Sequence, residues 1–206
     1  QSPPANTPFG GLNETIAVIL TAFDGNGNSE TCQFAVTLKD KTPPTVACQN
    51  ITVYLDGSGT ASIAAAQVFN AAQSSDHCGT VAVQSISSSM FTCNHLGANT
   101  VTLAAHDGYG NTRTCTAIVT VLDNIAPSIV CPANIVRGND AGQCGAAVMY
   151  ALPIASDNCG SPITSRQGGA NTASGSTFPK GITTVTWQAR DGALPPHTAT
   201  CSFTAT

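Results

Sequence analysis

The stretch AFDGNGNSETCQFAV, residues 22–36, decides the fold because it recurs. It returns as AHDGYGNTRTCTAIV at residues 105–119 and, in a weaker copy, as ARDGALPPHTATCSFTA at residues 189–205. The cysteines of the first two copies are 83 residues apart, and those of the last two are 86 apart. A segment that recurs at a fixed interval marks a repeated structural unit. The chain is therefore predicted to be a tandem array with a period of about 83 residues.

Three further pairs of segments keep the same register. They are VACQNITV (46–53) with IVCPANIV (129–136), SDHCG (75–79) with SDNCG (156–160), and the linker DKTPP from Asp40 with DNIAP from Asp123. These pairs predict the C-terminal half of one module at residues 1–42 and two full modules at residues 43–124 and 125–206. We interpret both ends as cuts through a longer array.

The composition favours an all-β, extracellular protein. Only 9% of the residues are charged, and the chain is rich in residues typical of strands and turns. No apolar run is long enough for a transmembrane helix, so no membrane insertion is expected. With seven Lys and Arg in total and a net charge of −4, the chain has no basic surface for nucleic acid. Nine cysteines outside CxxC pairs indicate disulfides, and hence a secreted or cell-surface location.

Period-two alternation of apolar residues in each copy predicts strands with one face toward a core. In the second copy, for example, Val101, Leu103 and Ala105 alternate with polar or small residues. Units of about 80 residues with short strands and frequent turns fit an immunoglobulin-like β-sandwich. A core of that size is marginal, so covalent support is expected. Trp187 falls on an inward position and is predicted to belong to the core.

The cysteine pattern predicts four disulfides if the two full modules share a fold. Each module has a cysteine in its first strand, one in SDxCG and one in its last strand, whereas the fourth differs between modules. The simplest solution is Cys48–Cys115, Cys131–Cys201, Cys78–Cys93 and Cys144–Cys159. Four cysteines allow three pairings, so other connectivities stay open. Cys32 is left without a partner in the chain, and we expect its partner upstream or in a neighbouring chain.

Metal sites have weak support in the sequence. Asp24 to Asn28 resembles the start of an EF-hand loop, but the loop lacks the glycine and the bidentate glutamate that calcium needs, and we interpret it as a hairpin turn. Asp40 and Asp123 are weak calcium candidates, with one carboxylate at each junction. A zinc site from the DHC and CNH segments is disfavoured because their two cysteines are expected to be bonded. We therefore expect no cofactor, with calcium as the open alternative.

The sequence contains no constellation typical of catalysis, so we do not expect an enzyme. His106 beside Asp107 is replaced by Arg190 in the last copy and by Phe23 in the first, and no base faces an activated nucleophile. Asn13 and Asn50 begin glycosylation sequons, which matter only if the source glycosylates secreted proteins.

The chain resembles the hyalin repeat, or HYR module. The resemblance rests on CPANIV, SDNCG, SGSTFPKGITTVTWQARDG and TCSFTAT, joined to the preceding unit by DNIAP. It implies a non-catalytic, immunoglobulin-like module used in adhesion, matrix or surface architecture. Our hypothesis is a structural repeat region of an extracellular fibre, matrix or cell-surface protein, whose partners are neighbouring modules or identical subunits joined head to tail. The alternative is an adhesin module that recognises a carbohydrate or protein ligand.

Overall fold

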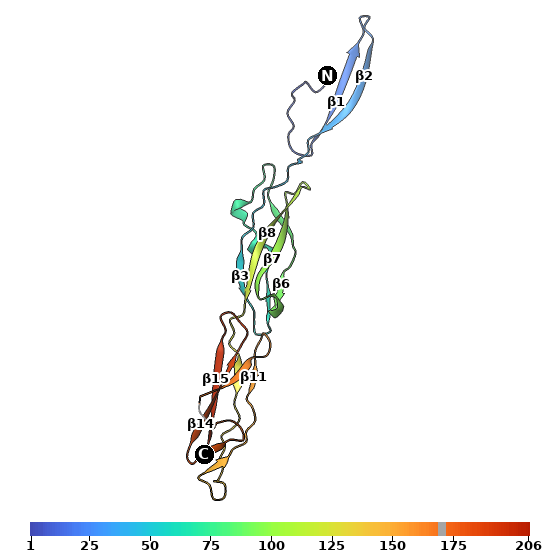
Figure 1. The fold of residues 1–206 in the computed structure, drawn as a ribbon. Coiled ribbons are helices and arrows are strands. Elements are labelled where there is room, and N and C mark those ends of the chain that lie inside the picture. The colour runs from blue at the N-terminus through green and yellow to red at the C-terminus, as the bar shows by residue number, and fades with distance from the viewer. Residues whose placement is uncertain (169–171) are drawn as a thin grey trace. The chain divides into compact units, whose positions relative to one another are not determined.

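The computed structural model describes residues 1–168 and 172–206, and it is all-β (Figure 1). Its strands are β1 (Thr15–Phe23), β2 (Ser29–Thr37), β3 (Ile51–Tyr54), β4 (Thr60–Ser62), β5 (Ala82–Ile86), β6 (Met90–Thr92), β7 (Gly97–His106), β8 (Thr112–Leu122), β9 (Ser128–Val130), β10 (Gly145–Ala147), β11 (Ile154–Ser156), β12 (Ile163–Gln167), β13 (Thr177–Pro179), β14 (Thr183–Arg190) and β15 (Thr198–Ala205). The described helices are single turns, α1 (Ala65–Val68), η1 (Ala71–Gln73) and η2 (Cys93–His95).

Strands β1 and β2 form an antiparallel hairpin at the start of the chain. The Asp24 carboxylate closes its turn by accepting the backbone N–H groups of Asn26 and Asn28, both at 2.8 Å. The hydrogen bond from the Asn28 side chain and these backbone donors lower the pKa of Asp24 below its usual range. Gly27 supplies the positive φ that the turn requires. The residues that resembled an EF-hand loop therefore form a hairpin turn.

The middle of the chain holds a four-stranded sheet in the order β3-β8-β7-β5, with a small sheet of β4 and β6. Alternate residues of the two long strands, β7 and β8, are buried, as the sequence predicted. They are Val101, Leu103, Ala105, Ala117, Val119 and Val121, each at most 2% exposed. Strand β3 pairs in parallel with β8, from Ile51 opposite Val119 to Tyr54 opposite Leu122.

The last part of the chain repeats this arrangement. Strands β12, β14 and β15 form one sheet, and the pairs β9–β11 and β10–β13 form the remaining ones. Its core contains the buried residues Val148, Phe178, Val185, Trp187, Phe203 and Ala205. The sequence placed Trp187 in the core, and its side chain is 9% exposed. Strand β14 leads directly to Asp191, so this packed sheet positions the site described below.

The first hairpin departs from the other two copies. The residues predicted to face inward include Leu20 and Phe34, but these side chains are 40% and 48% exposed, whereas their counterparts in later copies are buried. The described residues before β1 add one isolated bridge, Ser2 to Ile19, and no second sheet. The physical reason is that the described residues 1–42 supply no facing sheet to cover these side chains.

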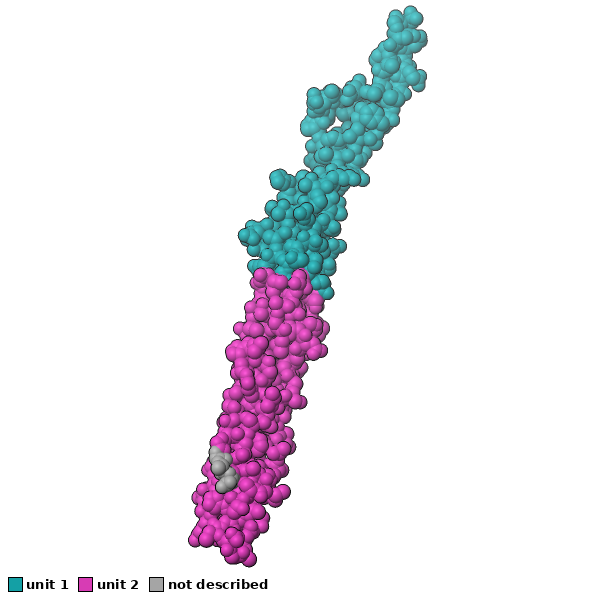
Figure 2. Space-filling view, in the orientation of Figure 1, with its two compact units in different colours: residues 1–49, 65–87, 102–117 teal, residues 50–64, 88–101, 118–206 magenta. Residues whose placement is uncertain are grey.

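The described chain also divides into two compact units (Figure 2). The first comprises residues 1–49, 65–87 and 102–117, and the second comprises residues 50–64, 88–101 and 118–206. This division cuts through the long strands β7 and β8 rather than following the sequence repeat. The module boundaries read from the repeat stay a prediction.

Replacing Phe203 with alanine should destabilise the last module strongly. Its side chain is 2% exposed and its ring packs edge-on against Tyr150 at 4.9 Å between centroids. Loss of a buried phenylalanine costs about 3–5 kcal/mol. Denaturant unfolding followed by the fluorescence of Trp187, the single tryptophan, measures this loss.

The matched control is Ile182→Ala, because Ile182 is 74% exposed and precedes β14. We expect it to change the free energy of unfolding by less than about 0.5 kcal/mol. Equal effects of the two substitutions would contradict the packing described for this core.

Candidate metal centre and the disulfides beside it

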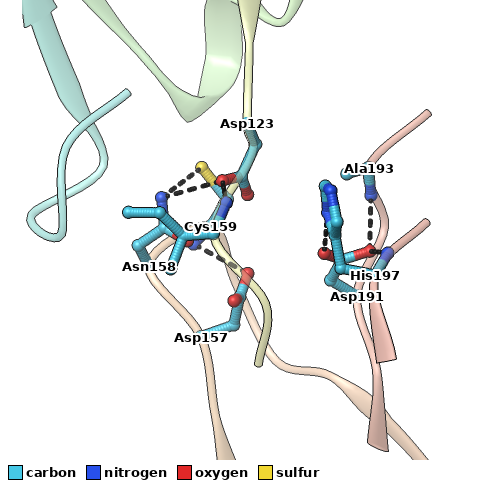
Figure 3. A network of polar contacts seen from close by, with 8 residues as sticks. Asp123, Asp157, Asn158, Cys159, Asp191, Ala193 and His197 are labelled. Atoms are coloured by element: carbon cyan, nitrogen blue, oxygen red, sulfur yellow. Dashed lines mark hydrogen bonds and ion pairs between the residues drawn. The ribbon is translucent and has the colours of Figure 1, made fainter. Parts of the chain in front are cut away.

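Three aspartates of the second unit converge on one point (Figure 3). Asp123 follows β8, Asp157 follows β11 and Asp191 follows β14. Each offers one carboxylate oxygen, and these three oxygens lie within 4.8 Å of one another. We call these residues the Asp123 cluster. It contains the acidic residues of three segments that recur in the sequence: the linker, SDNCG and the DG turn.

Local hydrogen bonds hold two of these carboxylates in place. Asp157 Oδ2 accepts the backbone N–H of Cys159 at 3.1 Å, which is the side-chain turn that Asp favours in loops. Asp191 Oδ1 accepts the N–H groups of Ala193 at 3.1 Å and His197 at 2.8 Å. The same turn chemistry that closes the first hairpin therefore orients a member of the cluster.

The linker aspartate is held from both sides. Asp123 Oδ1 accepts the backbone N–H of Ile125 and the side-chain amide of Asn158, both at 3.1 Å. The Asn158 amide also donates to the carbonyl oxygen of Asp56 at 3.2 Å. Asp123 and Asp191 are 7% and 6% exposed, so two of the three carboxylates are buried.

Several oxygens of this site have no hydrogen-bond partner within residues 1–168 and 172–206. They are Asp123 Oδ2, Asp157 Oδ1 and Asn158 Oδ1, and all three are buried. Buried polar groups are normally hydrogen-bonded, and a buried charge is costly unless it is paired. His197 is the basic side chain that contacts the cluster, with Nδ1 at 3.0 Å from Asp191 Oδ2. The site therefore contains several neighbouring oxygens that can each accept a further bond.

A second cluster, in the first unit, uses the equivalent residues Asp40, Asp76 and Asp107. Asp107 is 2% exposed; burial raises the pKa of its carboxyl, but hydrogen bonds from Asn111 and from the Tyr109 backbone outweigh this and lower it below its usual range. Asp40 Oδ2 is buried and has no hydrogen-bond partner in the part of the chain that the structure describes. The SDHCG segment places His77 where the other cluster has Asn158.

Of the six aspartates in the two clusters, Asp40 and Asp123 are the ones predicted as calcium candidates from the sequence. The other four belong to a turn or to the SDxCG motif, although all three positions recur in both modules. That recurrence was the available signal. The structure shows that the chain brings one aspartate from each of three distant segments together, and this closeness depends on the tertiary fold. Asp40 and Asp123 themselves stay candidates for metal binding.

The described residues form three disulfides. Cys48–Cys115 and Cys131–Cys201 join a segment at the start of each predicted full module to its last strand, with Cα atoms 5.7 Å apart in both cases. The third bond is Cys93–Cys159, with a Cα separation of 5.4 Å. It connects a residue of the predicted module 43–124 to a residue of the predicted module 125–206.

This third bond corrects the prediction of Cys78–Cys93. Cys93 lies just before β7, whereas Cys78 lies in the loop next to the turn that follows β7, where the neighbouring Gly79 approaches the Asp107 carbonyl. Strand β7 has ten residues and so spans about 30 Å. The two cysteines are at opposite ends of that strand, which is too far for a disulfide.

The prediction of Cys144–Cys159 is corrected for the same reason. The Cys144 carbonyl accepts the N–H of Lys180, just before β14, whereas Cys159 belongs to the loop at the Asp191 end of that strand. Cys32, Cys78 and Cys144 are free and exposed in the described structure. Desolvation raises the pKa of the Cys78 thiol, and the negative charges of the nearby cluster Asp40, Asp76 and Asp107 raise it further.

The remaining candidate residues have simple local roles. His95 Nδ1 accepts the backbone N–H of Thr92 at 3.0 Å and belongs to a capping box, and Cys93 is bonded, so neither is free for zinc. Asn13 is exposed, and Asn50 is exposed with its side-chain oxygen accepting the N–H of Ile118 at 2.7 Å. Glycosylation of these asparagines stays a prediction.

The repeats match a known family. The HYR domain matches residues 39–121 and 122–206. The chain belongs to the HYR domain family. It is 32% identical over 203 residues to Hyalin of Strongylocentrotus purpuratus, covering 93% of this chain and 16% of that protein. It is 31% identical over 157 residues to Hyalin of Lytechinus variegatus, covering 74% of this chain and 29% of that protein. The chain thus spans less than a third of either relative.

Solved structures of cadherin-type proteins are also similar. Extracellular domains 1–4 of protocadherin gamma B7 have 16% identity and a TM-score of 0.39, covering 93% of this chain and 57% of that one. The EC1-2 fragment of human protocadherin-24 has 14% identity and a TM-score of 0.39, covering 81% of this chain and 100% of that one. Among the described residues, no helix has the length and apolar character needed to cross a membrane.

Peptide mapping under non-reducing conditions should find Cys93 linked to Cys159. The substitution Cys159→Ser should release the Cys93 thiol for alkylation, because it removes the bonding partner of Cys93. The matched control, Cys144→Ser, should leave the Cys93–Cys159 peptide intact, since Cys144 is free. Recovery of a Cys78–Cys93 peptide from the folded chain would contradict this connectivity.

Proposed function

We propose that the HYR repeats of this chain form a non-catalytic, extracellular structural array in which a disulfide links each module to the next. We call this disulfide between modules the latch, and Cys93 the latch cysteine of its module. The observation that carries the proposal is the Cys93–Cys159 disulfide, because it joins residues of two consecutive repeats. The backbone already connects these repeats, so the disulfide is a second covalent link across the same junction. Disulfides of this kind persist in oxidising, extracellular compartments.

The geometry of the latch supports a repeating scheme. Cys144 stands in the position that Gly59 has in the preceding module, because both come just before the equivalent strands β10 and β4. A Cβ atom added to Gly59 would lie 2.7 Å from Cys93 Sγ. A cysteine at the position of Gly59 would therefore place its side chain next to the position of the latch sulfur, Cys93 Sγ. Cys144 has the position equivalent to Gly59 in its own module.

This equivalence assigns partners to two free cysteines. We call the cysteine of the SDxCG motif, such as Cys159, the DxC cysteine of its module. Cys144 would bond to the DxC cysteine of a following repeat, as Cys93 bonds to Cys159. Cys78, which is the DxC cysteine of its own module, would bond to a latch cysteine of a preceding repeat. In this scheme every junction carries one disulfide between the end of one module and the DxC segment of the next.

A hollow beside Cys144 supports a following module as its occupant. It is lined by apolar side chains that include Ile135, Val148 and Phe178, and by Lys180, whose N–H donates to the Cys144 carbonyl at 3.2 Å. The junction between the two predicted full modules shows the equivalent contact. There the end of the module 43–124, at Leu122, lies next to the turn after β14, where Ala193 is 6% exposed. We infer that the equivalent turn of a following repeat fits the hollow.

The first hairpin supports head-to-tail continuation at the other end. Val18, Leu20 and Phe34 lie on one face of β1 and β2, and Cys32 lies opposite Leu20 in the register. In the complete modules this face is covered by a second sheet, and the cysteine equivalent to Cys32 is bonded. A sheet from an upstream segment or from another copy would cover the apolar face and supply a cysteine that pairs with Cys32.

The test is disulfide mapping of the native material rather than of an isolated fragment. We expect Cys144 to be linked to a cysteine that follows an aspartate by two residues, and Cys78 to be linked to a cysteine outside its own module. Loss of mass on reduction would show that separate subunits are joined, whereas an unchanged mass would show a single longer chain. Free thiols at both positions in the native material would overturn the latch scheme.

A further inference from the structure

We propose that Asp123, Asp157 and Asp191 bind a divalent cation, and that the cation is Ca²⁺. This goes beyond the structural role of the array, because it makes one junction dependent on a bound ion. The three carboxylates offer oxygens within 4.8 Å of one another (Figure 3). Acidic clusters are common on protein surfaces, so the proposal rests on what is buried inside this one.

The deciding observation is an unpartnered, buried carboxylate oxygen. Asp123 is 7% exposed, and its Oδ2 has no hydrogen-bond partner among the residues that the structure describes, although Oδ1 has two. Asp157 shows the same division, since Oδ2 accepts the N–H of Cys159 and Oδ1 has no partner in the described part of the chain. In both residues the backbone orients one oxygen and leaves the other available within the cluster.

Asn158 contributes a further acceptor. Its amide nitrogen donates to Asp123 Oδ1 and to the Asp56 carbonyl, which fixes the direction of the side chain. Its Oδ1 is buried and has no hydrogen-bond partner among the described residues. The site thus combines three carboxylates with a neutral amide oxygen. Buried acceptors of this kind are costly unless a cation or a donor pairs with them, because the buried oxygens lose their bonds to water.

The donor chemistry selects the type of cation. The available donors are oxygens, because Cys159 is bonded to Cys93 and the Nδ1 atom of His197 already contacts Asp191. Oxygen donors suit hard cations, whereas zinc prefers thiolate and imidazole. Ca²⁺ accepts irregular sets of carboxylates, amide oxygens and waters, whereas Mg²⁺ demands near-octahedral geometry and keeps more of its water. A mixed set brought together from three loops therefore fits Ca²⁺ better.

The position of the site says what the ion would do. Asp123 belongs to the linker between the predicted modules, and Asp157 and Asp191 belong to the module that follows. A cation bound by all three would tie the linker to the loops of that module. The Cys93–Cys159 disulfide lies directly beside this point, with Cys93 Sγ 3.3 Å from the Asn158 carbonyl oxygen. The ion and the disulfide would then reinforce the same junction.

The proposal is confined to the Asp123 cluster. In the other cluster the residue equivalent to Asn158 is His77, so the amide oxygen is missing. Asp40 is also less buried than Asp123. This natural difference provides a useful substitution, because Asn158→His copies the sequence of a segment that the same fold already contains.

Thermal unfolding of the chelator-treated chain, with and without millimolar Ca²⁺, tests the site. The fluorescence of Trp187 is a local reporter, because this single tryptophan lies in β14, which leads into Asp191. We expect Ca²⁺ to raise the Tm of the wild-type chain, with a dissociation constant of about 10⁻⁴ to 10⁻³ M, as in other extracellular modules. Mg²⁺ at the same concentration should raise it less.

Two variants and one control make the test specific. Asp157→Asn keeps an acceptor for the Cys159 N–H but removes a charge, and it should lose most of the Ca²⁺-dependent rise in Tm. Asn158→His should weaken Ca²⁺ binding while the chain still folds. The control, Asp140→Asn, removes a charge in the same unit outside the cluster, where Asp140 pairs with Arg137, and should keep the full response to Ca²⁺.

One further comparison separates a lost site from a misfolded variant. Without Ca²⁺, Asp157→Asn should unfold at a temperature at least as high as wild type, because it relieves repulsion among the carboxylates. A wild-type chain with no response to Ca²⁺, or an Asp157→Asn variant with the wild-type response, would overturn the proposal. Neither result would affect the latch scheme, which is read from the disulfide map.

Discussion

The disulfide that joins the start of each full module to its last strand is the constraint on which the rest of the structure depends. A unit of about 80 residues buries little apolar surface, and the cores here consist largely of Val, Ala and a few aromatic residues. Closing loops of 67 and 70 residues contributes about 4 kcal/mol each in the chain-entropy account. With the sandwich held closed in this way, short strands suffice, and the loops at its ends are free to take other roles.

The aspartates at the module ends combine two of these roles. Asp191 accepts backbone N–H groups and so shapes the turn between β14 and β15, as Asp24 does in the first hairpin. In a complete module that turn also lies near the linker and the DxC loop, so the same carboxylate becomes part of a cluster. Asp24 has no such neighbours among the described residues, so it shapes its turn alone.

Much of the fold could be predicted from the sequence. The repeat identified the modules, and period-two alternation identified the buried faces, from Leu103 in β7 to Trp187 in β14. The same reasoning failed for Cys78 and Cys144. It treated each module as closed and matched cysteines by elimination, whereas the structure places the latch cysteines at opposite ends of the long strands from the DxC cysteines.

The sequence by itself determined the all-β class, the repeat, the family and the residues of the core, because these depend on periodicity and composition, which are local properties of the chain. Only the tertiary structure decided that Cys93 bonds to Cys159 and that Asp123, Asp157 and Asp191 meet. The physical reason is that both features join segments far apart in sequence whose distance is set by strand length and sheet packing. Neither strand length nor sheet packing can be derived from the sequence of any single segment.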